Sequence, residues 1–315
     1  MTYTQPKTTS RHAVVLCVDP AYLPYALFLA SQIHFHDPNR DFDICLLSDA
    51  ELIIPETLAY LNIRLYQPLN DPAYDRLSTT HLSRSTYLRM WAPLILSNDY
   101  DRILYLDSDM YCEGNGLSQL FGVNLKGRAI GAVLDVQQWY RPNRLIKEFQ
   151  LADMPAHPYF NGGMLLVDTA AYRKQDILGK ALAIEAAHPD WVRHHDQSLL
   201  NLVLQGNWTQ LSPVWNWQWP LKYPLFTDWQ EIRIQHFIGA LKPWHDTEGQ
   251  MPSRYYLGYK AFFEAHFPWL PQLPARKMEM LSDRKQLLWF ALRFAVMRAK
   301  LLRYCQQFPT AFSSK

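Results

Sequence analysis

Two carboxylates, Asp107 and Asp109, stand one residue apart directly after the apolar run 103–106. The run has the length and composition of a buried strand. In an extended chain, residues i and i+2 point to the same side, about 6.6 Å apart. Both carboxylates can therefore converge at the carboxyl end of the strand, where open α/β sheets bind ligands. Two hard oxygen ligands favour a divalent cation, and with it a phosphate-bearing substrate. Asp-Ser-Asp is also good turn chemistry, so the triplet alone leaves both interpretations open.

The elements that would position these carboxylates alternate between strands and helices. This alternation predicts an α/β fold with a mostly parallel central sheet flanked by helices. The predicted strands are 12–18, 42–47, 63–66, 103–106, 129–133, 164–167 and 232–238. The predicted helices are 22–34, 51–61, 83–96, 117–121, 177–187 and 198–204.

Several polar residues lie at the ends of these elements, and each has two interpretations. Asp19 follows the first strand, where it could bind a ribose or base edge or cap the next helix. Arg89 could neutralise a phosphate, orient a carboxylate or lie on a solvated helix face. His236 could be a core histidine or a nitrogen ligand that completes a site with the two aspartates. Asp196, with Gln197, could face a sugar or cap its helix.

Two further segments combine small or aromatic residues with a predicted strand. Asn161 and Gly162 lie in an Asn-Gly-Gly segment before the strand 164–167, where glycine permits close approach of a ligand or forms a plain turn. Trp215, Trp217 and Trp219 alternate, so in a strand they would share one face. Such a face could stack on an acceptor sugar or belong to the core.

Composition excludes some classes of protein. The chain has 315 residues, 49% of them hydrophobic, which is ordinary for a globular protein. A net charge of +2 argues against a nucleic-acid binder. The four cysteines show no paired spacing, which favours reduced thiols in a cytoplasmic protein. We see no apolar core of a signal peptide near the start and no run of 18 apolar residues.

The character of the chain changes near residue 250, which predicts a catalytic domain at 1–250 and a helical extension at 251–315. Helix 282–304, with a cap at Ser282 or Asp283, is basic and amphipathic and contains a tryptophan. Its cationic stripe is formed by Lys285, Arg293, Lys300 and Arg303. Such a helix could lie in an anionic membrane surface or dock on the catalytic domain. The first alternative predicts a peripheral protein on the inner face of the cell membrane.

Six segments, taken together and in order, resemble the family 8 retaining glycosyltransferases, especially the bacterial lipopolysaccharide α-galactosyl- and α-glucosyltransferases. The glycogenins are more distant relatives. The resemblance covers about residues 12–245. It rests on Asp19 with Tyr22, STYLR at 85–89, LYLDSD at 104–109, FNGG at 160–163, HDQSLLN at 195–201, and HFIG at 236–239 with KPW at 242–244.

The resemblance implies a GT-A fold and a set of site residues. The metal would be held by Asp107, Asp109 and His236. It is expected to be Mn²⁺, with Mg²⁺ as the alternative, because an imidazole among carboxylates favours Mn²⁺. Contacts to a UDP-sugar donor would come from Asp19, Tyr22, Arg89, Asp107, Ser108, Asn161, Gly162, Gly239 and Lys242. Catalytic contacts to the transferred sugar would come from Asp135, Asp196 and Gln197.

The predicted function is metal-dependent, retaining transfer of galactose or glucose from a UDP-sugar to a saccharide or glycolipid acceptor, in lipopolysaccharide or other surface glycan synthesis. One alternative is a catalytically silent nucleotide-sugar-binding protein on the same fold. The other is a sugar nucleotidyltransferase. Such enzymes usually use a Gly-rich basic loop near the start of the chain, and 13–25 shows none.

Overall fold

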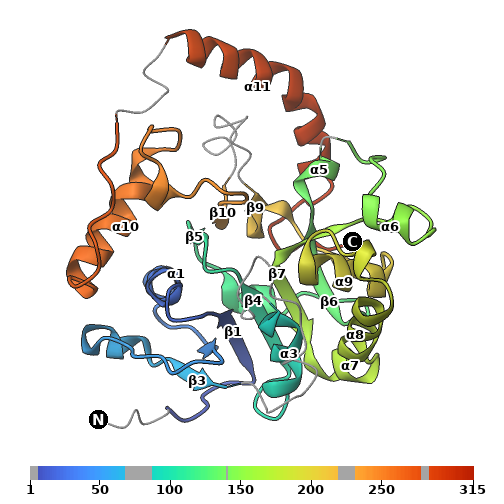
Figure 1. The fold of residues 1–315 in the computed structure, drawn as a ribbon, viewed down its shortest axis with the longest axis horizontal. Helices are drawn as coiled ribbons and strands as arrows, with labels where there is room; N and C mark the ends of the chain where they lie inside the picture. The colour runs from blue at the N-terminus through green and yellow to red at the C-terminus, as the bar shows by residue number, and fades with distance from the viewer. Residues whose placement is uncertain (1–5, 68–86, 140, 219–230, 278–283) are drawn as a thin grey trace.

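The computed structural model describes residues 6–67, 87–139, 141–218, 231–277 and 284–315. A seven-stranded sheet forms its centre, and helices lie on both sides (Figure 1). In spatial order the strands are β3 (Arg64–Tyr66), β2 (Asp43–Leu47), β1 (His12–Cys17), β4 (Arg102–Leu106), β7 (Phe160–Asp168), β6 (Ile130–Leu134) and β8 (Thr209–Gln210). Strand β7 is antiparallel to both its neighbours, and the other pairs are parallel. The predicted mostly parallel sheet is confirmed.

The central strands β1, β2 and β4 are almost entirely buried because their apolar runs are covered on both faces. The covering helices are α1 (Leu23–His36), α3 (Leu88–Ile95), α4 (Leu117–Phe121), α5 (Val136–Trp139), α6 (Lys147–Leu151), α7 (Thr169–Lys174), α8 (Ile177–Ala187), α9 (His195–Leu204) and α10 (Ser253–His266). Short 3₁₀ segments are η1 (Glu56–Leu61), η3 (Pro189–Trp191), η4 (Pro213–Trp215) and η6 (Pro243–His245). Residues 83–86 of the predicted helix 83–96 lie outside the described residues.

A second, three-stranded sheet matters most for function. It consists of β5 (Met110–Cys112), β10 (Ile234–His236) and β9 (Trp217–Gln218), with β10 in the middle. Strand β10 is antiparallel to β5 and parallel to β9. Because β5 begins directly after Asp109, this small sheet brings a segment from far along the chain to the end of β4.

Two predictions about local structure were wrong. The Asn-Gly-Gly segment is not a turn, because strand β7 starts at Phe160 and pairs there with β6, past a register shift after Ala132. The predicted helix 51–61 is reduced to η1, since Pro55 disfavours helical geometry in the residue before it.

For the alternating tryptophans, the core alternative is confirmed for the two that the structure describes, although they do not lie on one strand. Trp215 ends η4 and Trp217 begins β9, while Trp219 lies outside the described residues. Trp215 and Trp217 are 0% and 1% exposed, so these two side chains belong to the core and offer no surface to a sugar.

The part of the chain after residue 250 shares buried side chains with the part before it. Helix α10 packs on α1 through an aromatic cluster that includes Phe28 and Tyr259. Helix α11 (Arg284–Cys305) buries Leu301 and Tyr304, and Tyr304 stacks on Trp139 of α5. The last residue, Lys315, exchanges backbone hydrogen bonds with Gln210 of β8. The division at residue 250 stays a prediction, and the predicted caps Ser282 and Asp283 lie outside the described residues.

Candidate active site

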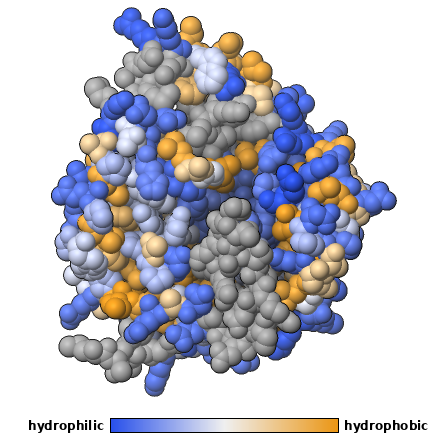
Figure 2. All heavy atoms as spheres, viewed as in Figure 1, coloured by the Kyte–Doolittle hydropathy of each residue, from blue (hydrophilic) through white to orange (hydrophobic). Residues whose placement is uncertain are grey.

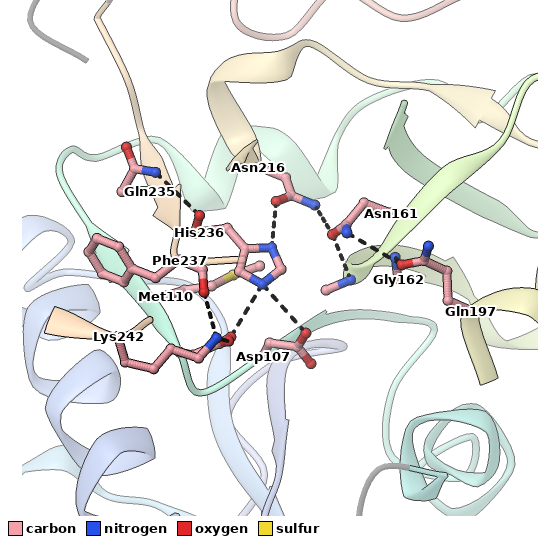
Figure 3. Close-up of polar contacts among 12 residues, drawn as sticks. Asp107, Met110, Asn161, Gly162, Gln197, Asn216, Gln235, His236, Phe237 and Lys242 are labelled. Carbon is pink, nitrogen blue, oxygen red and sulfur yellow. Dashed lines mark hydrogen bonds and ion pairs between the residues drawn. The ribbon is translucent and has the colours of Figure 1, made fainter. Parts of the chain in front are cut away.

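Strand register brings the predicted metal ligands together. His236 lies opposite Met110, and the neighbouring Phe237 amide donates to the Asp109 carbonyl at 3.2 Å. The His236 ring therefore points toward the end of β4, where its Nε2 is 3.3 Å from Asp109 Oδ1 and 3.7 Å from Asp107 Oδ2 (Figure 3). One ligand atom from each residue lies within 4.8 Å of the other two. The predicted convergence of Asp107, Asp109 and His236 is confirmed.

The chemistry of this group fits a divalent cation. Asp109 Oδ1 is buried and accepts no hydrogen bond from any described residue. Burial alone would raise the pKa of Asp109, but His236 and Lys242 outweigh burial and hold that pKa below its ordinary value. Lys242 Nζ lies 2.5 Å from the other carboxylate oxygen, Oδ2. An ionised carboxylate with an unpartnered oxygen beside an imidazole nitrogen is a ready ligand set for Mn²⁺ or Mg²⁺.

Asn216, which our sequence reasoning missed, holds the histidine in place. Its Oδ1 lies 3.0 Å from His236 Nδ1, and its Nδ2 donates to Asn161 Oδ1 at 2.9 Å (Figure 3). An amide oxygen facing Nδ1 favours a proton there, which leaves the Nε2 lone pair directed at the two aspartates. Asn216 is fully buried. In the sequence it stands between Trp215 and Trp217, and the alternating tryptophans were the more evident pattern there.

We expect Asn216→Leu to weaken Mn²⁺ binding by about 10- to 100-fold, because residues that orient metal ligands have effects of this size. The measurement is a calorimetric Mn²⁺ titration of the free protein. Gln218→Leu is the matched control, since Gln218 is an equally buried amide that bonds to the backbone of 134–136 instead. Both variants should lose stability. Equal Mn²⁺ affinity in the two would contradict the orienting role.

Arg89 joins the metal group to a second carboxylate. Its Nη1 is 3.1 Å from Asp107 Oδ1 and donates to the Gly162 carbonyl at 2.8 Å, while its Nε is 2.8 Å from Asp196 Oδ2. Burial opposes the charge, but Asp107 and Asp196 raise the pKa of Arg89 overall. The interpretation of Arg89 as a solvated helix residue was wrong, because its side chain is only 10% exposed.

Gln197 is hydrogen-bonded to strand β7. Its Oε1 accepts hydrogen bonds from the Gly162 amide at 2.8 Å and from Asn161 Nδ2 at 3.3 Å (Figure 3). Asn161 Oδ1 in turn accepts from the Gly163 amide and from Asn216. One network therefore runs from His236 through Asn216 and Asn161 to Gln197. It connects a candidate cation site to a polar surface suited to sugar hydroxyls.

The residues 13–248 match the model of the glycosyl transferase family 8. The chain belongs to this family. Glycosyltransferase GlyF of Streptococcus pneumoniae serotype 4 is 29% identical over 250 residues, which are 75% of this chain and 58% of GlyF. Lipopolysaccharide 1,2-glucosyltransferase of Escherichia coli K12 is 28% identical over 237 residues, 72% of this chain and 67% of that enzyme.

Solved structures of glycosyltransferases share the fold. Galactosyltransferase LgtC, determined with donor and acceptor sugar analogues, superposes with a TM-score of 0.63 at 23% identity, over 83% of this chain and 97% of LgtC. The bifunctional glycosyltransferase WbbM superposes with a TM-score of 0.62, over 83% of this chain and 50% of WbbM. The predicted family and the predicted GT-A fold with a helical extension are confirmed. This chain spans little more than half of GlyF, so its substrates are argued below as proposals.

The other predicted site residues of this family 8 chain lie at the same edge of the sheet. Asp19 follows β1, the parallel neighbour of β4, and its Oδ1 accepts from the Tyr22 amide at 3.0 Å in the turn before α1, whose own N-cap, Tyr22, has no side-chain cap. Tyr22 is 45% exposed at the start of α1. Gly239 has a φ of 86°, in the region that favours glycine, and its exposed amide follows β10. Ser108 is half-buried between the two aspartates. Their donor contacts stay predictions.

Two buried carboxyl groups lie beside the Asn161–Gln197 network of this family 8 chain. Asp135 follows β6, and burial raises its pKa. Asp196 is 2% exposed, and burial raises its pKa to about 6, although Arg89 opposes the shift. Asp196 Oδ2 is paired with Arg89 as an ion but accepts no hydrogen bond from the described residues. This oxygen is itself closed to solvent, and the contact of Asp196 with a sugar stays a prediction.

We expect turnover at saturating metal to fall as pH decreases through about 6, since protonation of Asp196 removes the partner of Arg89. The stability of the fold depends on pH in the opposite direction. A folded pKa above the ordinary 3.8 stabilises the fold below pH 3.8, and this contribution is lost as pH rises through about 6. The pH profile of kcat/KM measures the first effect. Asp196→Asn should be less active and should lack this acid limb. An unchanged limb in the variant would assign it to another group.

Two other features agree with the sequence. All four cysteines lie in the described part of the chain and are free thiols. Among the described helices, none is both long enough and apolar enough to cross a bilayer.

Proposed function

We propose that the protein is a divalent-metal-dependent, retaining hexosyltransferase that moves galactose or glucose from a UDP-sugar to a saccharide or glycolipid acceptor in lipopolysaccharide or other surface glycan synthesis. The observation that carries the proposal is the convergence of Asp107, Asp109 and His236 beside the Asn161–Gln197 network. Membership of family 8, and the similarity to bacterial lipopolysaccharide glucosyl- and galactosyltransferases, support the same class of substrate.

In this proposal Asp107, Asp109 and His236 would hold Mn²⁺, or alternatively Mg²⁺. When bound, the ion supplies positive charge that stabilises the departing diphosphate. Lys242, which lies beside Asp109, adds a second cation at the same place. Asp19 and Tyr22, at the end of β1, would contact the nucleoside. The exposed amide of Gly239 and the hydroxyl of Ser108 would contact the phosphates.

The hexose would lie against the polar surface on β7 and α9. Asp135, Asn161 and Asp196 would accept or donate hydrogen bonds to its hydroxyls, and the Arg89–Asp196 pair would keep that carboxylate ionised and oriented. Gln197 is an unsuitable nucleophile because its amide is neutral and its oxygen already accepts two hydrogen bonds. This favours attack by the acceptor on the face from which UDP departs, with a UDP oxygen accepting the proton.

The test is a panel of UDP-sugars incubated with the protein and Mn²⁺. We expect slow hydrolysis of UDP-galactose or UDP-glucose, which chelator stops and Mn²⁺ restores. Binding without turnover of any member, with or without added saccharides, would favour the silent binding protein. Formation of UTP from a UDP-sugar and pyrophosphate would favour the nucleotidyltransferase.

We further propose that α11 attaches the protein to the inner face of the cell membrane. Leu288, Leu292 and Val296 are four residues apart, so they share one helix face, and they are 73%, 64% and 65% exposed. Trp289 is half-exposed, with Arg293 stacked 3.7 Å from its ring centroid. Helix α11 lies at the top of the view in Figure 1, and in the same view apolar and hydrophilic side chains lie side by side along that edge of the molecule (Figure 2). A helix with an exposed apolar face and cations around it suits an anionic lipid surface.

We expect Leu288→Gln with Leu292→Gln to reduce sedimentation with phosphatidylglycerol vesicles by about tenfold or more, because each exposed leucine loses a transfer energy of about 1.5–3 kcal/mol. Leu257→Gln is the control, since Leu257 is 56% exposed on α10. Substitution is preferable to truncation because Leu301 and Tyr304 are buried in the core. Unchanged sedimentation of the double variant would leave α11 as a docked helix only.

A further inference from the structure

A pocket of about 790 Å³ lies between α5, the loop 141–145, the segment 156–158 and the carboxyl-terminal turns of α11. We call it the α5–α11 pocket. It is separate from the metal group, since none of Asp107, Asp109 and His236 lines it. Its volume falls within the range of small-molecule sites. Its lining includes Gln138, Trp139, Arg144, Lys300, Arg303 and Tyr304.

The charge of the pocket is entirely positive. Arg144, Lys300 and Arg303 line it, and no described lining residue is acidic. None of the three forms an ion pair with a described carboxylate elsewhere. Clustered cations without acids repel one another and raise the local potential, so an anion entering the pocket would be attracted from all sides.

The uncharged part of the lining suits a sugar. Trp139 and Tyr304 stack with ring centroids 5.4 Å apart and are only 2% and 5% exposed, so they form a closed apolar floor under the pocket. Gln210 donates to the Tyr304 hydroxyl at 3.3 Å, and Asn143 and Gln307 bring exposed amides to the lining. Polar groups around an apolar floor are typical of sites for small ligands.

The pocket adjoins the candidate active site. Helix α5 begins at the residue after Asp135, and its four residues span only about 6 Å. Gln138 and Trp139 at its far end line the pocket. Arg144 is also close enough to lower the pKa of Asp135, although burial, the larger effect, raises it. One oligosaccharide could therefore place a hydroxyl near Asp135 and a neighbouring unit in the pocket.

We propose that the α5–α11 pocket binds the phosphate group of a phosphorylated sugar unit, so that the acceptor is an anionic saccharide. This deepens the proposed transferase function and rests on it for the role as acceptor. Arg144 from the loop and Lys300 and Arg303 from α11 would hold the phosphate by charge-assisted hydrogen bonds. The exposed amides of Asn143 and Gln307 would contact the hydroxyls of the sugar ring.

The test is calorimetric titration with glucose 6-phosphate, with glucose and inorganic phosphate as companions. We expect glucose 6-phosphate to bind best and to lose affinity with added salt. Arg144→Gln should weaken its binding by about tenfold or more, because a charge-assisted hydrogen bond is lost. Arg141→Gln is the matched control, since Arg141 is exposed on the same loop and does not line the pocket. Lys242→Gln, at the candidate metal site, should also leave this binding unchanged.

Three outcomes would overturn the proposal. The first is equal affinity of the wild type and Arg144→Gln for glucose 6-phosphate. The second is loss of glucose 6-phosphate binding in Lys242→Gln. The third is that the wild type binds no glucose 6-phosphate and that Arg144→Gln no longer sediments with phosphatidylglycerol vesicles. The last result would show that the pocket binds a lipid headgroup. The titrations need neither metal nor donor. If the protein hydrolyses a UDP-sugar but binds no glucose 6-phosphate, only the proposal for the pocket is refuted. If it binds glucose 6-phosphate but hydrolyses no UDP-sugar, the proposed transferase function is refuted.

Discussion

Asp109→Asn should abolish Mn²⁺-dependent turnover of the UDP-sugar, lowering it by about 10³-fold or more. Charge stabilisation by a metal is worth several kcal/mol, and each 1.4 kcal/mol is tenfold in rate. Asp109 supplies the oxygen nearest to His236 Nε2, at 3.3 Å, and an amide in its place has no charge to offer a cation. The Asp109 side chain is also the partner of Lys242, so the variant leaves that ammonium without its carboxylate.

The fold should survive this change, because asparagine has the same shape and the hydrogen bond from the Phe237 amide, just beyond the paired strands β5 and β10, uses the Asp109 backbone carbonyl. Asp101→Asn is the matched control. Asp101 lies at the opposite end of β4, is 64% exposed and pairs with Arg11 at the surface. Turnover with each variant and a Mn²⁺ titration of each free protein are the measurements. Full turnover and unchanged Mn²⁺ affinity in Asp109→Asn would refute the metal site.

The sequence predicted this site because its parts lie where strands end. Asp107 and Asp109 follow a buried strand, and His236 ends another, so their positions depend on strand pairing more than on loop conformation. Six ordered segments made the family recognisable, although the individual Asp-Ser-Asp triplet was ambiguous. The cap expected from Asp19 was only approximate, since its carboxylate bonds to the turn before α1 and the helix itself has no side-chain cap.

The parts that sequence reasoning missed depend on contacts between distant segments. Nothing near Asn216 indicates that its two ends would meet His236 and Asn161, which are 20 and 55 residues away. Arg89 was expected to neutralise a phosphate or orient a carboxylate, and the second alternative is confirmed, but its sequence context did not indicate that it would join Asp107 to Asp196. The Asn-Gly-Gly segment looked like a turn, and pairing on both sides of β7 overrode that local preference.

Gly163→Ala should weaken Mn²⁺ binding, as Asp109→Asn does, although it removes no polar group. A Cβ at this position would lie 2.3 Å from His236 Cε1 and 2.8 Å from Asp107 Oδ2, closer than real Cβ contacts come. Strand β7 cannot move away, because the Gly163 carbonyl accepts from the Asp107 amide at 2.8 Å and the next residue pairs with Leu106. The methyl group must therefore displace the two ligand side chains.

Gly162→Ala is the matched control for this glycine. Its Cβ would lie 3.2 Å from Gln197 Cβ and 3.5 Å from Arg89 Nη1, so small adjustments accommodate it. Neither glycine has a positive φ, so the two variants differ in the space available and not in backbone strain. We expect Gly163→Ala to lower Mn²⁺ affinity by at least about tenfold, the lower end of the range for disturbed metal ligands, and Gly162→Ala to retain it. Thermal unfolding of both should show a folded protein. If Gly163→Ala binds Mn²⁺ as the wild type does, the ligands must move freely, and the close packing of β7 against His236 cannot be what positions them.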